Sequence, residues 1–416
     1  MSKFSALHQS IKIRLYLQFA TSLATLTIMP FIAIYFSRLV GETITGILLI
    51  SVIFSGIVGG LIGGYWSDQI GRKKLLIFSE LGIGISFLAI AFMNSPWLVA
   101  PYISFGLFLV NMFCSGIFYP VSTAMIYDLV KKEERNYVFT AMYWITNLAV
   151  ALGSITGAFL FEDYHFYLFI FVAIISIASS IITYLFIGET FIKEEPSVSA
   201  ASPSILANYL NVMKDKTYMI FLIGSLLVFS LEGHLTNYIA IHLEKTMEQT
   251  TLFGSFTING LNMVGILQAE NTLLVVFTVA IVAWLVKNRT DGWKLLFGMG
   301  IYVIGYALLS YTNSPWILIG LMVFISIGEL IYVPIHQGLL AELADGSYRS
   351  SYLALDSLAG QGQMIIAGAA VTIGGFVSPG IMSGTFFLFG LIGVCMMSYV
   401  MKEISKRGTQ EKTNVQ

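Results

Sequence analysis

Twelve long apolar segments recur along the chain, and they restrict its fold more than any other feature. About 20 predominantly apolar residues are the length that an α-helix needs to cross a bilayer. Residues 243–267 fit no such segment and are interpreted as a partly ordered loop. The sequence therefore predicts an all-α integral membrane protein with twelve transmembrane helices. The predicted spans are residues 13–37, 44–66, 75–94, 99–129, 137–160, 166–188, 217–242, 268–287, 294–312, 315–342, 350–374 and 379–401.

The composition excludes several classes of protein. Of the residues, 56% are hydrophobic and only 11% are charged, whereas soluble domains average about 25% charged residues. The net charge of −1 lacks the basic excess of a nucleic-acid-binding protein. Cys114 and Cys395 both lie in apolar runs, which argues against a disulfide framework or a cysteine metal site. No nucleotide-binding loop or nucleophile motif is found, so an ATP-driven pump or an enzyme is disfavoured and no cofactor is expected.

The distribution of basic residues predicts the orientation in the membrane. Of the 22 Lys and Arg residues, all except Arg38 and Lys245 fall on one side of the predicted spans. Short cytoplasmic loops carry such an excess of basic residues. We therefore expect a multi-pass protein of the cell membrane with both termini in the cytoplasm.

A polar segment at residues 189–216, which contains "IKEEPSVSAASPS", divides the twelve spans into six and six. Its Pro and Ser content is typical of a flexible linker. The predicted domains are an N-terminal six-helix bundle at 1–188, this cytoplasmic linker, and a C-terminal six-helix bundle with a tail at 217–416. Two joined halves of this kind favour a secondary transporter, with a substrate site between halves that rock against each other.

The stretch "GGYWSDQIGRKKLL", residues 63–76, is unusual for the end of a span because it combines an acid with a basic cluster. Glycines at 56, 60 and 64 recur at every fourth residue and predict a helix face that a second helix can approach closely. Gly71 permits the turn. The positive-inside rule alone explains Lys73 and Lys74 but not Asp68, which is suited to a neighbouring helix N-terminus.

This stretch resembles the hairpin between spans two and three of the major facilitator superfamily. Trp66, Ser67 and Gln69 depart from the family pattern. The resemblance implies that Asp68 lies near span eleven and that Arg72 pairs with Asp128 at the end of span four. It also implies that the cluster is a conformational latch, formed only when the cytoplasmic side is closed. The residues that match are Gly64, Asp68, Gly71, Arg72 and Lys73.

Within this superfamily the chain is similar to Gram-positive multidrug/proton antiporters of the twelve-span type. The similarity includes "ETITGILLIS" at 42–51, "YWITNL" at 143–148 and "GELIYVP" at 328–334. Two acids expected from that group are missing, with Met142 and Thr236 near their places. These differences leave the drug range and the number of protons open.

Glu329 is interpreted as the deepest acid in the spans, about 22 Å along span ten at 1.5 Å per residue. Acidic residues within a membrane face the bundle interior and mark transport pathways. We expect Glu329 to bind a proton near neutral pH and to release it when a cation arrives, a role that the resemblance also implies. A neutral, hydrogen-bonded Glu329 is the structural alternative. His336, two turns further along the same face, is the one cation of the span that is placed to neutralise it.

Several other polar residues in the spans are compatible with more than one role. Glu232 and His234 fit a gating or proton-access role and an interfacial position equally well. Asp356 is compatible with the latch, with proton supply, or with a local helix break, and Glu80 is interpreted as interfacial. The predicted proton-coupling residues are Glu329, Asp128, Asp68, Asp356 and Glu232. The predicted substrate-cavity residues are Tyr143, Trp144, Asn147, Glu329 and His336.

The sequence as a whole predicts a monomeric, proton-driven exporter of lipophilic, often cationic drugs that works by rocker-switch alternating access. Its expected partners are these small substrates, protons and the lipid bilayer, and such export would confer antibiotic resistance. Few polar side chains are expected at the membrane midplane, which favours an apolar substrate over a sugar. Symport or export of a specific nutrient or metabolite is the alternative, and a non-transporting membrane sensor is less favoured.

Overall fold

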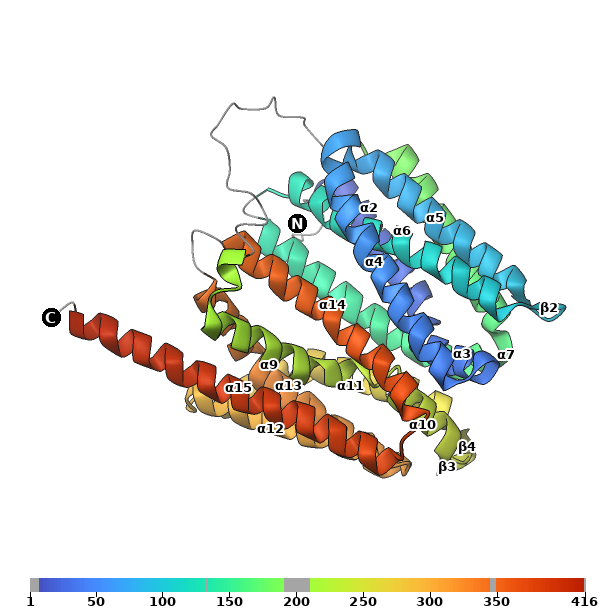
Figure 1. The fold of residues 1–416 in the computed structure, drawn as a ribbon. Helices are drawn as coiled ribbons and strands as arrows, with labels where there is room; N and C mark the ends of the chain where they lie inside the picture. The colour runs from blue at the N-terminus through green and yellow to red at the C-terminus, as the bar shows by residue number, and fades with distance from the viewer. Residues whose placement is uncertain (1–6, 132–133, 191–209, 345–348, 415–416) are drawn as a thin grey trace. The chain divides into compact units, whose positions relative to one another are not determined.

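The computed structural model describes residues 7–131, 134–190, 210–344 and 349–414. The chain divides into two compact units (Figure 1). Unit 1 comprises residues 1–197 and 258–273, and unit 2 comprises residues 198–257 and 274–416. Residues 191–209 of the predicted linker lie outside the described residues.

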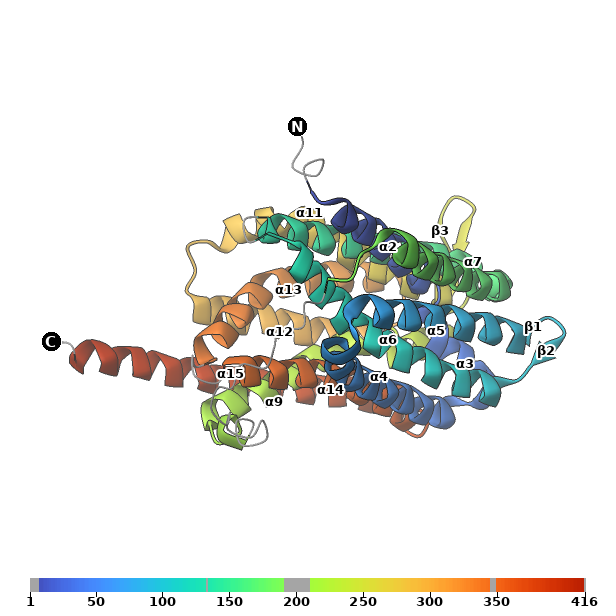
Figure 2. The same cartoon turned by 90° about the horizontal axis from the view of Figure 1, so that it is seen from above.

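Unit 1 is built from long helices that pack side by side. The helices α4, α5 and α6 run alongside one another, and β1 and β2 form a small antiparallel hairpin where α5 and α6 are joined (Figure 2). The elements are α2 (Gln9–Leu26), η1 (Met29–Phe31), α3 (Ile32–Val40), α4 (Glu42–Ile70), α5 (Arg72–Met93), β1 (Asn94–Ser95), β2 (Leu98–Val99), α6 (Pro101–Leu129) and α7 (Arg135–Phe186).

Unit 2 has the same character, with α12 packed against both α13 and α15, and α9 against α14 and α15. The elements are α9 (Lys216–Gly233), α10 (Tyr238–Thr246), β3 (Thr250–Phe253), β4 (Phe256–Ile258), α12 (Asp291–Leu309), α13 (Pro315–Leu343), α14 (Arg349–Gly374) and α15 (Pro379–Asn414). The helix α11 (Gly260–Val286) begins in unit 1 and ends in unit 2.

Ten helical segments in the described part of the chain are long and apolar enough to cross a membrane. One of them, at Tyr137–Phe186, has 50 residues, more than twice the length of a single span. Its helix α7 has a non-helical backbone at Tyr164 (φ −125°, ψ 19°), between the predicted fifth and sixth spans. The helix α14 covers the predicted eleventh span and is not among the ten. The all-α membrane fold is thus confirmed.

The interpretation of residues 243–267 as a partly ordered loop is wrong. This segment contains the end of α10, the two-stranded sheet of β3 and β4, and the start of α11 at Gly260. The polar residues that lower its hydropathy cap the helix, because the Asn259 and Asn262 side-chain oxygens each accept a hydrogen bond from the other's backbone N–H at 2.9 Å. The eighth predicted span therefore starts too late.

The glycine face of α4 brings its backbone close to α6. Any side chain at Gly59 or Gly63 would collide with the α6 backbone at Phe113 or Ile117. In the predicted repeat of every fourth residue, a Cβ at Gly56 or Gly60 would lie 3.5 Å or 3.6 Å from the α6 backbone, whereas a Cβ at Gly64 would meet nothing within 4 Å. Such faces allow close van der Waals packing of membrane helices.

Candidate functional site

Two carboxyl groups of unit 2, those of Glu232 in α9 and Glu329 in α13, lie close enough to interact electrostatically. Both also interact with Tyr302, Tyr306 and Tyr332. These rings are buried and pack together, with ring centroids 4.8 Å apart for Tyr302 and Tyr306 and 5.2 Å for Tyr302 and Tyr332. Glu329 is half-buried and Glu232 is exposed on the unit. An acid pair against a tyrosine wall can take up and release a proton.

A break in the seventh predicted span positions Glu232. The helix α9 ends at Gly233, and α10 starts at Tyr238, so Glu232 occupies the last turn before the break. The buried ring of His234 follows it and stacks on Phe386 with centroids 4.0 Å apart. Broken helices of this kind line substrate or ion sites in transporters.

His336 has other partners than the acid pair. Its Nε2 lies 2.7 Å from the Ser225 hydroxyl, and its ring stacks on Phe221 with centroids 4.6 Å apart. His336 and Asp356 both line a pocket of about 270 Å³ within unit 2. The structure therefore connects His336 with Asp356 through this pocket, and Glu329 is not among the residues that line it.

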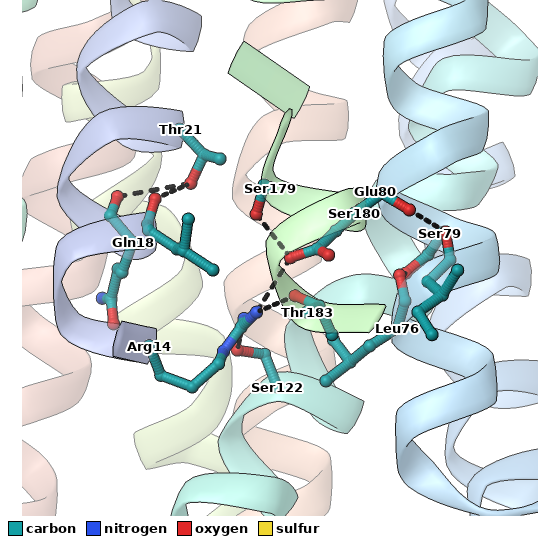
Figure 3. A network of polar contacts seen from close by, with 12 residues as sticks. Arg14, Gln18, Thr21, Leu76, Ser79, Glu80, Ser122, Ser179, Ser180 and Thr183 are labelled. Carbon is teal, nitrogen blue, oxygen red and sulfur yellow. Dashed lines mark hydrogen bonds and ion pairs between the residues drawn. The ribbon is translucent and has the colours of Figure 1, made fainter. Parts of the chain in front are cut away.

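Unit 1 contains a buried ion pair that the sequence interpretation missed. Arg14 Nη1 lies 2.8 Å from Glu80 Oε1, and the two side chains are only 1% and 2% exposed (Figure 3). Arg14 also donates to the hydroxyls of Ser122 at 2.7 Å and Thr183 at 3.4 Å, while Ser179 donates to Glu80 Oε1 at 2.8 Å. The interpretation of Glu80 as interfacial is wrong. A charged pair is buried at such cost only where hydrogen bonds compensate it.

Glu80 of this pair lines a cavity of about 410 Å³ whose wall is formed mainly by α2, α5, α6 and α7. On α7 the cavity is lined by Met142, Thr146, Val150 and Ser176. The predicted cavity residues Tyr143 and Trp144 are 53% and 47% exposed and do not line it. The side chain of Asn147, also outside this cavity, donates to the Tyr143 carbonyl of its own helix. Their predicted role in substrate binding stays a prediction.

The hairpin between α4 and α5 forms the ion pair expected from the resemblance, because Arg72 contacts Asp128 at the end of α6. The Thr190 hydroxyl donates to Asp128 Oδ2 at 3.1 Å. The side chain of Asp68 lies outside the described residues. The latch role of this cluster stays a prediction.

Glu189, which was assigned to the linker, caps α5. Its carboxylate accepts hydrogen bonds from the backbone N–H groups of Arg72 at 3.0 Å and Lys73 at 3.1 Å. A negative charge is favourable at a helix N-terminus. Gly71 has φ = 97°, and a Cβ there would collide with the Glu189 carboxylate. The Lys73 ammonium lies over the Tyr184 ring, 5.6 Å from its centroid.

We expect Asp128→Asn to slow turnover about fivefold, since a loss of about 1 kcal/mol from one conformation shifts a population by that factor. The measurement is transport rate against substrate affinity in proteoliposomes. Lys74→Gln, which changes an exposed basic residue of the same hairpin, is the matched control. Exchanging the charges with Arg72→Asp and Asp128→Arg should recover part of the rate. Wild-type turnover of Asp128→Asn would remove the latch role from this pair.

Glu270 is a second acid that the sequence interpretation missed. It lies about 15 Å along α11 at 1.5 Å per residue, and its Oε2 is buried with no hydrogen-bond partner among the described residues. The predicted span began at residue 268, which placed Glu270 at the membrane edge. A predicted helix that began at the Asn259 cap would have placed Glu270 well inside the span.

Comparisons with known proteins agree with this architecture. A family model described as Major Facilitator Superfamily matches residues 15–361. A Na(+), Li(+), K(+)/H(+) antiporter of Planococcus maritimus is 31% identical over 410 residues, 95% of this chain and 94% of the relative. A class H tetracycline resistance protein of Pasteurella multocida is 25% identical, covering 85% of this chain and 87% of its own. The solved structure of a POT family transporter in complex with 5-aminolevulinic acid has a TM-score of 0.72 at 15% identity, covering 96% of both chains, a likeness that shows the fold alone.

Proposed function

Since the chain belongs to the Major Facilitator Superfamily, a family of membrane transporters and not of enzymes, we propose that it is a proton-coupled antiporter that exports monovalent cations. The observation that carries the proposal is the interacting pair of Glu232 and Glu329 in unit 2. Two neighbouring carboxyl groups can hold one proton between them, as proton-coupled exchange requires. A proton is therefore carried without any cofactor.

The proton gradient supplies the energy for this exchange. An inward proton releases about 2.3 kcal/mol per 100 mV of membrane potential. In the proposed cycle the acid pair is protonated on the outer side, and the proton leaves on the inner side. Release of the proton accompanies the binding of the exported cation, so the two species travel in opposite directions.

Alkali metal ions are the first candidate substrates. The Planococcus maritimus relative is named for Na⁺, Li⁺ and K⁺ and resembles this chain over nearly its full length. The second candidate is a lipophilic organic cation. In its favour, the unit 1 cavity of about 410 Å³ has the size of a drug pocket and includes the rings of Phe87, Phe118 and Tyr119.

Proteoliposomes with an acidic interior separate these candidates. The lumen contains a pH-sensitive dye, and NaCl, KCl, LiCl, choline chloride or a fluorescent lipophilic cation is added outside. We expect alkalinisation of the lumen with the alkali salts and none with choline chloride. Alkalinisation by the lipophilic cation alone would support the second candidate. If no cation moves protons, the antiport proposal is wrong.

A further inference from the structure

Most of the residues that line the unit 1 cavity carry polar side chains, and the proton-coupling pair does not use them. Hydroxyl and amide side chains line the cavity from α2, α6 and α7, with Glu80, Ile83 and Phe87 contributed by α5. The polar lining residues are Gln18, Thr21, Ser22, Thr25, Glu80, Asn111, Ser115, Tyr119, Ser122, Thr123, Thr146 and Ser176.

Two buried oxygen atoms of this wall have no hydrogen-bond partner among the described residues. They are Oε2 of Glu80, which is 2% exposed, and Oδ1 of Asn111, which is 0% exposed. Buried acceptors of this kind cost free energy unless a ligand, ion or water satisfies them. The site is therefore built to receive a positive or hydrogen-donating group.

The hydrogen bonds that the Asn111 side-chain nitrogen donates determine the orientation of the amide. Its nitrogen lies 2.9 Å from the Ser86 hydroxyl and 3.4 Å from the Ile83 carbonyl, so the acceptor Oδ1 is the end left over. Ile83 follows Glu80 by three residues on α5, about 4.5 Å along the helix. Through this contact with Ile83, Asn111 of α6 lies next to the turn of α5 that follows Glu80.

We propose that this cavity binds a desolvated alkali metal cation, with Glu80 Oε2 and Asn111 Oδ1 as ligands and neighbouring hydroxyls completing the shell. The inference rests on the proposed cation antiport and assigns the exported ion to unit 1. Carboxylate, amide and hydroxyl oxygens are the donors that hard cations prefer. Among the described residues no group of three or more His, Cys, Asp and Glu side chains gathers to hold a metal ion, so the proposed shell depends on one carboxylate together with amide and hydroxyl oxygens.

Arg14 determines the charge of the ion that fits. It neutralises most of the Glu80 charge across 2.8 Å, so the site offers oxygen ligands with little net negative charge. The Arg14 cation would repel a divalent ion about twice as strongly as a monovalent ion at the same distance, which favours a monovalent ion. Weak binding suits a transported ion. The proton would be carried by Glu232 and Glu329 of unit 2, so cation binding would release the proton through a change of conformation and not through competition for one carboxylate.

Binding of ²²Na⁺ to the purified full-length protein tests the site. We expect wild-type protein to bind ²²Na⁺, with displacement by LiCl and KCl but not by choline chloride or MgCl₂. Asn111→Leu removes an unpaired acceptor at similar size and should weaken binding at least about tenfold, the loss typical of one interaction with a charged group. Glu80→Gln should weaken it by at least as much. Thr156→Val, which removes an α7 hydroxyl bonded within its own helix and outside the cavity, should bind like wild type.

The outcomes separate this site from the antiport proposal. Absence of ²²Na⁺ binding, or equal affinity of Asn111→Leu and wild type, would overturn the site. Asn111→Leu carries that test even if Glu80→Gln fails to fold. If ²²Na⁺ binding depends on Asn111 but no salt moves protons in proteoliposomes, the site stands and antiport fails. If salts move protons and Asn111→Leu leaves the half-saturating Na⁺ concentration unchanged, antiport stands and the site fails.

Discussion

Replacing Glu329 by glutamine is expected to reduce proton-coupled cation exchange by about two orders of magnitude. This is the lower range of the loss when a positioned proton-transfer group is removed. Glutamine has nearly the same size but cannot exchange a proton, so the acid pair with Glu232 becomes a single acid. The measurement is the initial rate of Na⁺-driven alkalinisation in proteoliposomes with an acidic lumen.

Glu248→Gln is the matched control for this variant, because Glu248 is an exposed acid in the short connection between α10 and β3. It should exchange like wild type. Glu232→Gln should be impaired as well, since Glu232 is the electrostatic neighbour of Glu329. Exchange by Glu329→Gln at the wild-type rate, with the same dependence on the pH gradient, would rule out Glu329 as the coupling acid.

Replacing Arg14 by leucine is expected to destabilise the protein by about 3–5 kcal/mol, the typical cost of leaving one member of a buried ion pair uncompensated. Both side chains are almost fully buried, so solvent cannot replace the lost partner. The free energy of unfolding in detergent micelles, measured by denaturant titration, tests this expectation.

The double variant Arg14→Leu, Glu80→Leu separates burial of a charge from loss of packing. Replacing a buried ion pair by apolar residues is often neutral or stabilising, so the double variant should be more stable than Arg14→Leu. If the double variant unfolds as readily as the single one, the destabilisation comes from packing and not from the stranded Glu80 carboxylate.

The sequence was sufficient to predict the membrane fold because mean hydropathy over 20 residues depends little on the identity of any single residue. The Arg72–Asp128 contact could also be predicted, since Arg72 belongs to a compact motif with a known family resemblance. The resemblance to the major facilitator superfamily is confirmed. The first prediction depends on a local pattern in the sequence. The second depends on a pair of residues that the resemblance to the family assigns to each other.

The Arg14–Glu80 pair could not be predicted in this way. The two residues are 66 positions apart, and each alone fits a basic or acidic residue near a membrane surface. Only the packing of their helices shows that both are buried. The polar cavity was missed for a related reason, because its hydroxyls are spread singly over several helices and hardly change the mean hydropathy of any one span.

Proton release on cation binding tests the central claim most directly. NaCl is added to purified protein in weakly buffered detergent solution, and a pH dye reports the protons released per molecule, with choline chloride as the blank. The account predicts release from wild-type protein and none above the blank from Glu329→Gln. Equal release from both proteins would contradict the assignment of the transported proton to Glu329 and its neighbour Glu232.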